Sequence, residues 1–449
     1  MRLPALILAL LASCLPLGAQ AQALPDAPAM AQLEPVFLAF FPLYEMARLR
    51  YVSVEAAANP RRQDVNQFNH LRRLLDHTDR TVTAPNNDTL YSSARLDLSR
   101  GPLLIETPAI PGRYYSLQFM NAYTDNLAVL GRRTHGDGPL RIAVVGPQWN
   151  GPLPAHTQRL QSDTNDLWLL IRTLVDGPQD IAAVAALQEQ YRITAPEPAS
   201  AYPRQRRAPP AQPTPAQFLS VVNEFLGRNP PQGRMATIAT GARALGIAPG
   251  QPEAWAALAE PVRQAWTTHW EALRARLLQP TTLQSRVIGG WEFPPPGVGT
   301  WGDNDLLRAT VALRGIAALD LAETQYLAAN ADAEGRPLDG AARYRLRIPP
   351  GGLPVQGFWS LTMYEALPDG RYFLVDNPIR RYSVGNRTQG LKANPDGSID
   401  ILMQRDAPVD TTNWLPAPAG RFRLSLRAYL PQADFAQGRG PLPQLERLP

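Results

Sequence analysis

Carboxylate, phenol and guanidinium side chains gather in a short stretch of the first half of the chain. Asp88 and Tyr91 stand at the start of a strand-like segment, and Arg113 and Asp125 follow soon after. A carboxylate that accepts a proton and a phenol that donates one are components of acid–base catalysis. These four residues are therefore the candidate catalytic residues. A structural alternative stays open, because Asp88 fits a turn that enters a strand, and Arg113 could form a buried pair with Asp88 or Asp125.

Amide and aromatic side chains that could hold a polar ligand accompany these residues in both halves of the chain. Trp414 lies in a proline-rich loop, residues 413–420. A tryptophan on such a stiff loop either plugs the hydrophobic core or offers a stacking platform for a ligand. The candidate ligand-binding residues are Asn87, Tyr115, Tyr123, Asn126, Arg380 and Trp414.

Metal and cofactor chemistry has no recognisable motif in the sequence. The histidines lack a spacing such as His-Glu-x-x-His, so no metal site is expected. A Gly-x-Ser-x-Gly elbow is absent, and the Gly-Gly pairs lack the context of a phosphate loop. We therefore expect no cofactor. The histidines are His70, His77, His135, His156 and His269.

The elements that must position the candidate residues are short strands in two separate regions. Tyr115, Leu117 and Phe119 alternate with polar neighbours, and Tyr344, Leu346 and Ile348 do the same. Alternation with period two predicts half-buried antiparallel strands, so residues 81–176 and 340–430 should form two β-units. Since unpaired polar groups are costly to bury, we expect the candidate residues of the first block and the Trp414 loop to line one cleft between these units.

Helical spacing of apolar residues dominates between and before the β-units. Residues 31–58 predict a helix that Pro42 would kink or split. Residues 180–193 predict a short helix with Asp180 as its N-cap, and residues 216–226, 251–278 and 303–330 predict three more. The expected domains are an N-terminal β-unit with a leading helix (31–193), a Pro/Arg-rich linker or loop (194–215), a mostly helical segment (216–335) and a C-terminal β-unit (336–449).

The first residues are typical of an export signal. Arg2 precedes an apolar run that extends to Leu17, and small residues suited to cleavage follow it. Residues 1–23 therefore predict a signal peptide and a periplasmic or secreted protein. The alternative is a lipobox that ends at Cys14, which would anchor the protein to the envelope through a lipid. Because Cys14 is the single cysteine, its removal with the signal would exclude disulfides.

The charge pattern argues against nucleic-acid binding. The formal net charge is +5, Lys392 is the single lysine, and the arginines are spread along the chain apart from residues 204–207. A nucleic-acid-binding protein would concentrate them on one face or element. The expected partner is an unknown small molecule or envelope ligand, and a homo-oligomer stays open.

Two blocks of motifs carry a resemblance to a known family. The first, residues 87–91 with 123–126, resembles the domain of unknown function 1254, and the second resembles the domain of unknown function 1214. The resemblance implies a multi-domain α+β protein with two antiparallel jelly-roll-like β-sandwich units and added helices, and no established reaction. A cofactor-independent hydrolase or lyase is one expectation, and an envelope-associated ligand-binding or structural protein without catalysis is the other. The second block comprises residues 358–362, Asn377, 380–382, 396–398 and 413–418.

Overall fold

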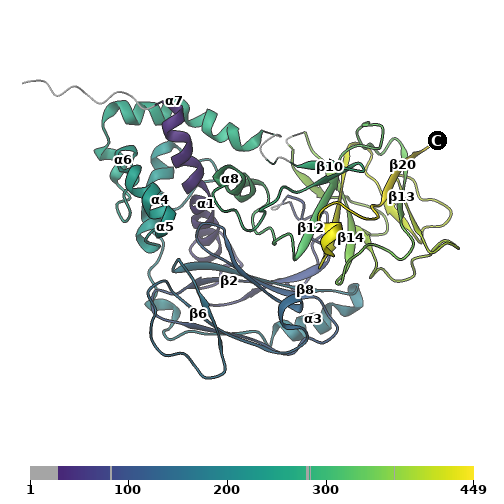
Figure 1. Cartoon of the computed structure of the whole chain (residues 1–449), viewed down its shortest axis with the longest axis horizontal. Helices are drawn as coiled ribbons and strands as arrows, with labels where there is room; N and C mark the ends of the chain where they lie inside the picture. Colours follow the sequence, from purple (N-terminus) through teal and green to yellow (C-terminus); the bar gives the residue numbers. More distant parts are fainter. Residues whose placement is uncertain (1–28, 81–82, 280–282, 284, 369) are drawn as a thin grey trace, which may run out of the picture.

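Helices and several antiparallel or mixed sheets form an α+β protein with three parts (Figure 1). The computed structural model describes residues 29–80, 83–279, 283, 285–368 and 370–449. The predicted signal segment 1–23, with Cys14, lies outside these residues. In Figure 1 a helical part sits at the upper left, an N-terminal β-unit below it and a C-terminal β-unit to the right. Over the described ranges, no helix has the length and apolar character needed to cross a membrane.

The N-terminal β-unit consists of two sheets that share one core. Apolar side chains of both sheets, such as Leu96, Ile105, Leu117 and Ile142, form a single buried cluster. Two short helices lie within the unit, α2 (Arg132–His135) between β5 and β6 and α3 (Ile181–Gln188) between β8 and β9. The first sheet has the order β1 (Asn69–His70), β2 (Thr89–Asp97), β8 (Asp166–Leu174), β4 (Tyr115–Met120), β5 (Asn126–Gly131); the second has the order β7 (Gln158–Gln161), β6 (Leu140–Val145), β3 (Leu103–Thr107), β9 (Arg192–Thr194).

The C-terminal β-unit repeats this two-sheet plan. Leu346, Leu361, Ile401 and Leu424 come from both of its sheets and form one buried cluster. The first sheet has the order β10 (Arg286–Ile288), β11 (Trp291–Phe293), β12 (Thr324–Ala329), β19 (Phe422–Tyr429), β14 (Trp359–Ala366), β15 (Tyr372–Leu374), with β16 (Ser383–Gly385) also paired to β14; the second has the order β18 (Trp414–Pro416), β17 (Ile399–Gln404), β13 (Arg343–Ile348), β20 (Gln444–Leu448), and α9 (Ala433–Ala436) follows β19.

The helical part packs around an aromatic centre. Phe37 of the first helix contacts Phe218 and Trp270, with ring centroids 5.5 Å apart in both pairs. The first helix continues through Pro35 and Pro42 without a break, because its buried apolar side chains hold it against the other helices. The helices are α1 (Met30–Val54), α4 (Pro215–Arg228), α5 (Gly233–Gly241), α6 (Ala254–Ala257), α7 (Glu260–Leu278) and α8 (Asp305–Arg314).

Several elements differ from the sequence prediction. The helix expected over residues 251–278 is divided into α6 and α7, because the backbone is extended at Leu258. The helix expected over residues 303–330 ends at Arg314, and Thr324–Ala329 forms β12, which pairs with β19. Gly315 ends the helix, and Ala317 has a φ of 68°, which a continuing helix does not allow. As a result, part of the segment expected to be mostly helical belongs to the first sheet of the C-terminal β-unit. The side chain of Asp180 does not cap α3; it binds Arg113 instead.

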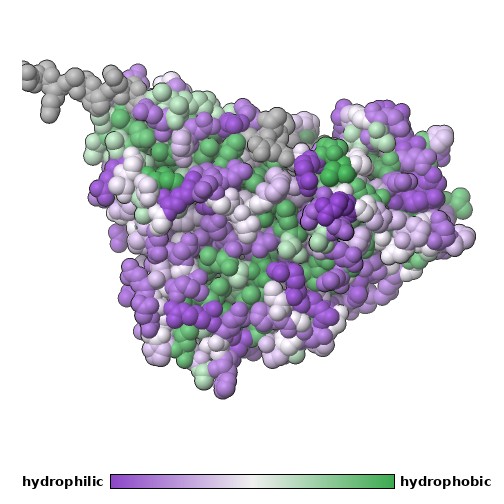
Figure 2. Space-filling model, viewed as in Figure 1, coloured by the Kyte–Doolittle hydropathy of each residue, from purple (hydrophilic) through white to green (hydrophobic). Residues whose placement is uncertain are grey.

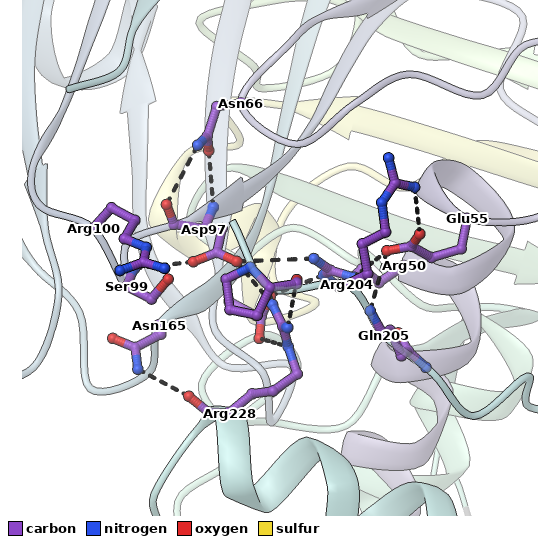
Figure 3. A network of polar contacts seen from close by, with 12 residues as sticks. Arg50, Glu55, Asn66, Asp97, Ser99, Arg100, Asn165, Arg204, Gln205 and Arg228 are labelled. Carbon is purple, nitrogen blue, oxygen red and sulfur yellow. Dashed lines mark hydrogen bonds and ion pairs between the residues drawn. The ribbon is translucent and has the colours of Figure 1, made fainter. Parts of the chain in front are cut away.

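A buried ion network joins the helical part to the N-terminal β-unit (Figure 3). Asp166 of β8 accepts a hydrogen bond from Arg50 Nε of α1 at 2.9 Å and one from Arg228 Nε of α4 at 2.9 Å. Asn229 Nδ2 donates to the same carboxylate at 2.9 Å, and Arg228 Nη2 also reaches Asp97 of β2 at 2.8 Å. Two helices and two strands therefore meet at one set of paired charges.

Candidate functional site

A band of buried polar side chains joins the two β-units, and we call it the polar seam. Its members come from β2, β4, β5 and β8 of the N-terminal unit, from β12, β14 and β19 of the C-terminal unit, and from the segments beside them. Hydrophobic residues gather in the middle of the molecular face in Figure 2, over the part of the N-terminal β-unit where Figure 1 shows β2 and β8. The polar seam comprises Asn86, Asp88, Tyr91, Tyr114, Gln118, Asn126, Arg172, Asp320, Glu323, Tyr326, Ser360, Tyr364, Arg427 and Tyr429.

Asp88 is the carboxylate of the seam that links the two units directly. Ser360 Oγ of β14 donates a hydrogen bond to Asp88 Oδ2 at 2.7 Å, and the Asp88 residue is only 8 % exposed. Among the described residues, this is its one side-chain hydrogen bond. Burial raises the pKa of Asp88, and the nearby Arg427 charge and the bond from Ser360 only partly offset that rise. Such a carboxyl is suited to accept and release a proton.

Arg427 places a positive charge beside this carboxylate. It donates to Thr362 Oγ1 at 2.9 Å and to the Tyr364 hydroxyl at 2.7 Å, both on the neighbouring strand β14. Burial alone would lower the pKa of Arg427. The neighbouring Tyr364, Tyr429 and Asp88 have the larger, opposite effect, so the net pKa is raised and Arg427 stays charged. The hydrogen-bonding partners of Arg427 are thus neutral, and Asp88 supplies the nearby negative charge.

Tyr429 brings a phenol into the same cluster. Asn86 Nδ2 donates to its hydroxyl at 2.7 Å. Burial, and after it the Asp88 carboxylate, raises the pKa of Tyr429 well above its ordinary value, so this hydroxyl keeps its proton. A protonated phenol that accepts from Asn86 still has its own hydrogen to donate.

Arg172 continues the seam along β8. Its Nη1 donates to Gln118 Oε1 at 2.7 Å, and Gln118 Nε2 donates to Asn126 Oδ1 at 2.7 Å. Asn126 Nδ2 then donates to Asp320 Oδ1 at 2.6 Å, so an unbroken chain of hydrogen bonds crosses between the units. The guanidinium of Arg172 also lies over the Tyr91 ring, 5.5 Å from its centroid. Within the described part of the chain, the Tyr91 hydroxyl makes no hydrogen bond.

Tyr114 and Glu323 form a second crossing. The Tyr114 hydroxyl donates to Glu323 Oε1 at 2.9 Å, and Arg133 Nε donates to Glu323 Oε2 at 2.6 Å. Burial raises the pKa of Glu323 despite both bonds. An aromatic cluster covers this crossing, because Phe358 stacks on Tyr429 with centroids 4.0 Å apart and Tyr114 contacts both rings.

The structure divides the predicted catalytic residues between different environments. Asp88 and Tyr91 belong to the seam. Arg113 forms no ion pair with Asp88 or Asp125 in the described residues and pairs with Asp180, with Nη2 donating to Oδ1 at 2.9 Å. The predicted pairing of Arg113 with Asp88 or Asp125 was therefore wrong. The segment after β8 brings Asp180 next to Arg113, which directly precedes β4. Asp125 pairs with Arg308 at 3.1 Å, and burial raises its pKa.

The predicted ligand-binding residues are divided in the same way. Asn126 takes part in the seam. The Tyr115 hydroxyl donates to Gly136 O at 3.1 Å from inside the N-terminal core, and Tyr123 is buried against the helical part, where its hydroxyl has no hydrogen-bond partner in the described residues. Asn87 Nδ2 donates to the carbonyl of Leu75. Arg380 is exposed.

Trp414 is buried outside the C-terminal core cluster: its neighbour Leu415 on β18 belongs to that cluster, and adjacent side chains of a strand point to opposite faces of the sheet. Trp414 is 1 % exposed, and its Nε1 donates to Gln404 O at 2.9 Å. In the described residues, the ring makes no hydrogen bond with the residues of the first block. Two pockets among the described residues lie away from the seam. One, of about 80 Å³, adjoins Arg95, and the other, of about 460 Å³, adjoins Arg343 and Arg447. Within the described ranges, no three His, Cys, Asp or Glu side chains form a group that could hold a metal ion.

Several seam residues did not stand out in the sequence. Arg172 and Arg427 occupy the interior of strands that are otherwise buried, in Leu-Leu-Ile-Arg-Thr-Leu and Leu-Ser-Leu-Arg-Ala-Tyr. An arginine is rarely buried without a partner. Its presence inside an apolar strand could therefore have indicated a buried polar site. Ser360 and Tyr364 gave no such signal, because their strand resembles an ordinary core strand.

Comparison with known proteins shows the same two blocks. Residues 65–195 match the family model described as protein of unknown function (DUF1254), and residues 323–433 match the one described as protein of unknown function (DUF1214). No curated protein matches. The fold is that of the VPA0106 protein from Vibrio parahaemolyticus, at a TM-score of 0.68 and 23% identity over 93% of this chain and 99% of that one.

A second solved structure, an uncharacterised protein from Burkholderia cenocepacia, has a TM-score of 0.45 and 13% identity over 94% of this chain and 91% of that one. The DUF1254 match contains β2, β4 and β8, and the DUF1214 match contains β12, β14 and β19. Each matched region thus supplies one side of the polar seam. The chain belongs to the family of proteins that carry DUF1254 and DUF1214 in tandem.

Proposed function

We propose that the chain is an exported acid–base enzyme, a cofactor-independent hydrolase or lyase, whose site is the polar seam. The observation that carries this proposal is the Asp88 carboxyl, which is buried between two units, has a raised pKa and has, among the described residues, one side-chain hydrogen bond, from Ser360. Titratable groups with shifted pKa values concentrate at functional sites. The seam combines several of them with two buried arginines.

The side chains of the seam have distinct roles in this proposal. Asp88 accepts the proton from a substrate or a water molecule and returns it later. Arg427 and Arg172 stabilise the negative charge that develops on the substrate, as fixed positive groups do in a site of low dielectric. The Tyr91 hydroxyl is available to donate a hydrogen bond to the substrate because it has no partner in the described residues.

A second candidate function is ligand binding or a structural role at the envelope without catalysis. One observation favours it: Arg172, Gln118, Asn126 and Asp320 already satisfy one another in a continuous chain of hydrogen bonds.

Export to the periplasm or beyond rests on the predicted signal segment, with attachment through lipidated Cys14 as the alternative. N-terminal sequencing of the protein from the envelope fraction separates the two.

The jelly-roll class of the β-units also belongs to this proposal. In each first sheet, an early strand and the last strand are neighbours: β2 lies beside β8, and β12 beside β19. A Greek key brings its fourth strand back beside its first in this way, and a jelly roll contains two Greek keys.

The experiment compares Tyr91→Phe and Asp88→Asn with the wild type in a panel of chromogenic esters and of substrates with an acidic C–H next to a carbonyl. Tyr91→Phe removes a hydroxyl without a partner, so we expect a normal melting temperature and a loss of activity of about tenfold or more. Asp88→Asn removes the proposed base, and activity should fall by about a hundredfold or more.

Arg141→Lys serves as the control, since it alters an exposed ion pair with Glu106 in the second sheet of the N-terminal β-unit, outside the seam. It should keep the activity of the wild type. If Tyr91→Phe retains full activity on every substrate that the wild type turns over, the seam is not the catalytic site. If neither the wild type nor the variants turn over any substrate, and Asp88→Asn only lowers the melting temperature, the structural role replaces the catalytic one.

A further inference from the structure

Arg95 is a buried arginine that the structure holds in a fixed position. It lies on β2 directly opposite Trp168 of β8, and its guanidinium carbon stands 4.0 Å from the centre of the Trp168 ring. Trp168 Nε1 in turn donates to Ser93 Oγ at 2.8 Å, which fixes the ring. The guanidinium thus rests on an oriented aromatic face, a favourable place for a cation.

The charge of Arg95 lacks the acceptors that a buried guanidinium needs. The residue is 6 % exposed, yet its Nε and Nη1 atoms are buried and have no hydrogen-bond partner in the described residues. A buried donor without an acceptor costs about 1–3 kcal/mol, and more for a charged group. Native proteins leave few such groups, so Arg95 carries a charge that the described residues do not compensate.

A pocket adjoins the side chain. Its volume is about 80 Å³, and a single water needs only about 10–15 Å³ on this measure. The space therefore accommodates a small polyatomic group. Exposed side chains of the segment between α1 and β1 form the mouth, and amides and hydroxyls predominate in the wall. The lining residues are Ser53, Asn59, Arg61, Gln63, Asp64, Gln67, Asn69, Ser93 and Arg95.

The charges behind the pocket leave Arg95 without a carboxylate of its own. Asp166 and Asp97 pair with Arg228, and Glu55 pairs with Arg50 and Arg204. With Arg95, four guanidinium groups meet these three carboxylates. Burial, and next to it the Arg50 charge, lowers the pKa of Arg95 to about 9, which is the direction expected of a cation that lacks a counter-ion.

We propose that Arg95 and this pocket bind an oxyanion group, the carboxylate of a small organic acid or a phosphate, with the Arg95 guanidinium as the donor group. Amides such as Gln63 and Gln67 at the mouth would contact the rest of the ligand. Asp64 also lies at the mouth, and its negative charge favours a singly charged anion over one of higher charge. This site is separate from the seam, although Tyr91, Ser93 and Arg95 point to the same face of β2.

The test measures the binding of two probes, sodium acetate and sodium phosphate, to the mature chain by titration calorimetry and thermal melting at constant ionic strength. The wild type should show a saturable rise in melting temperature with at least one probe, and the two arms distinguish a carboxylate site from a phosphate site. Arg95→Gln removes the donors, so the Kd should weaken by about tenfold or more. Without anion, this variant should melt at or above the wild-type temperature, because it removes a buried charge that lacks acceptors.

Two further variants complete the design. Arg159→Gln makes the same charge change at an exposed position of β7 and should keep the wild-type Kd. Arg95→Lys keeps the charge but loses the guanidinium, so it decides the question if Arg95→Gln does not fold: binding weakened by about tenfold supports the site. A wild-type Kd in Arg95→Lys or Arg95→Gln, or no saturable rise with either probe in the wild type, overturns the proposal.

Discussion

Replacing Asp166 with asparagine should reveal how strongly the ion network holds the helices to the N-terminal β-unit. Burial raises the pKa of this carboxyl, but Arg228 and Arg50 outweigh that effect and lower it from its ordinary 3.8 to about 2. One pKa unit corresponds to about 1.4 kcal/mol, so these contacts contribute about 2 kcal/mol at neutral pH. The substitution also removes a negative charge that two buried arginines, Arg50 and Arg228, contact. Breaking a buried ion pair costs about 3–5 kcal/mol. Because Arg228 keeps Asp97 and Arg50 keeps Glu55, we expect about 3 kcal/mol.

Urea unfolding of the wild type and Asp166→Asn at several pH values measures this loss. A carboxyl with a lowered folded-state pKa stabilises the protein above its unfolded pKa, and this contribution disappears as the pH falls through the folded value. The difference between the two proteins should therefore be largest at neutral pH and shrink between pH 4 and pH 2. Asp406→Asn, at an exposed position whose side chain forms no ion pair or hydrogen bond in the described residues, is the control and should change stability by less than about 0.5 kcal/mol. Equal unfolding midpoints for Asp166→Asn and the wild type at pH 7 would refute the reasoning.

Three further substitutions test other contacts. Trp414→Ala should lower the free energy of unfolding by about 3–5 kcal/mol in urea titrations, because it removes a large, fully buried ring; an unchanged midpoint would show that packing of the ring does not stabilise the fold. Arg113→Ala leaves Asp180 without its ion partner in a partly exposed place, so calorimetry should show a loss of about 1–3 kcal/mol, and a larger loss would contradict the pairing described. Tyr123→Phe should leave the melting temperature unchanged or raise it, since the hydroxyl is buried without a partner; a marked decrease would reveal a partner that this geometry lacks.

The sequence predicted those elements in which one periodicity dominates. The alternation of Tyr344, Leu346 and Ile348 predicted β13, where these side chains are buried and the intervening arginines are not. It did not predict β12, because the segment around Leu327 is rich in alanine and supports a helical pattern as readily as an alternating one. The pairing of β12 with β19, almost a hundred residues later in the chain, decides between the two.

The candidate site was predictable in its residue types but not in its partners. Asp88, Tyr91 and Asn126 belong to the seam, as the first motif block suggested, yet Asp88 binds Ser360, which lies 272 residues away. A local pattern contains no information on such a pair, because the pair depends on how two separate units dock. For the same reason Arg113 was paired with the wrong carboxylate.

The seam explains physically why the two family domains occur in one chain. Asp88 and Arg427 come from different units, and each would lose the nearby opposite charge if the units separated. The aromatic rings of Tyr114, Phe358 and Tyr429 would become exposed at the same time, and such rings bury about 150–250 Å² each. The buried charges of Asp88 and Arg427 favour one relative orientation of the units, since a misplaced buried charge is costly. Burial of the aromatic rings supplies most of the driving force for docking of the units. The tandem is therefore best understood as one structural unit whose polar centre exists only when both domains are present.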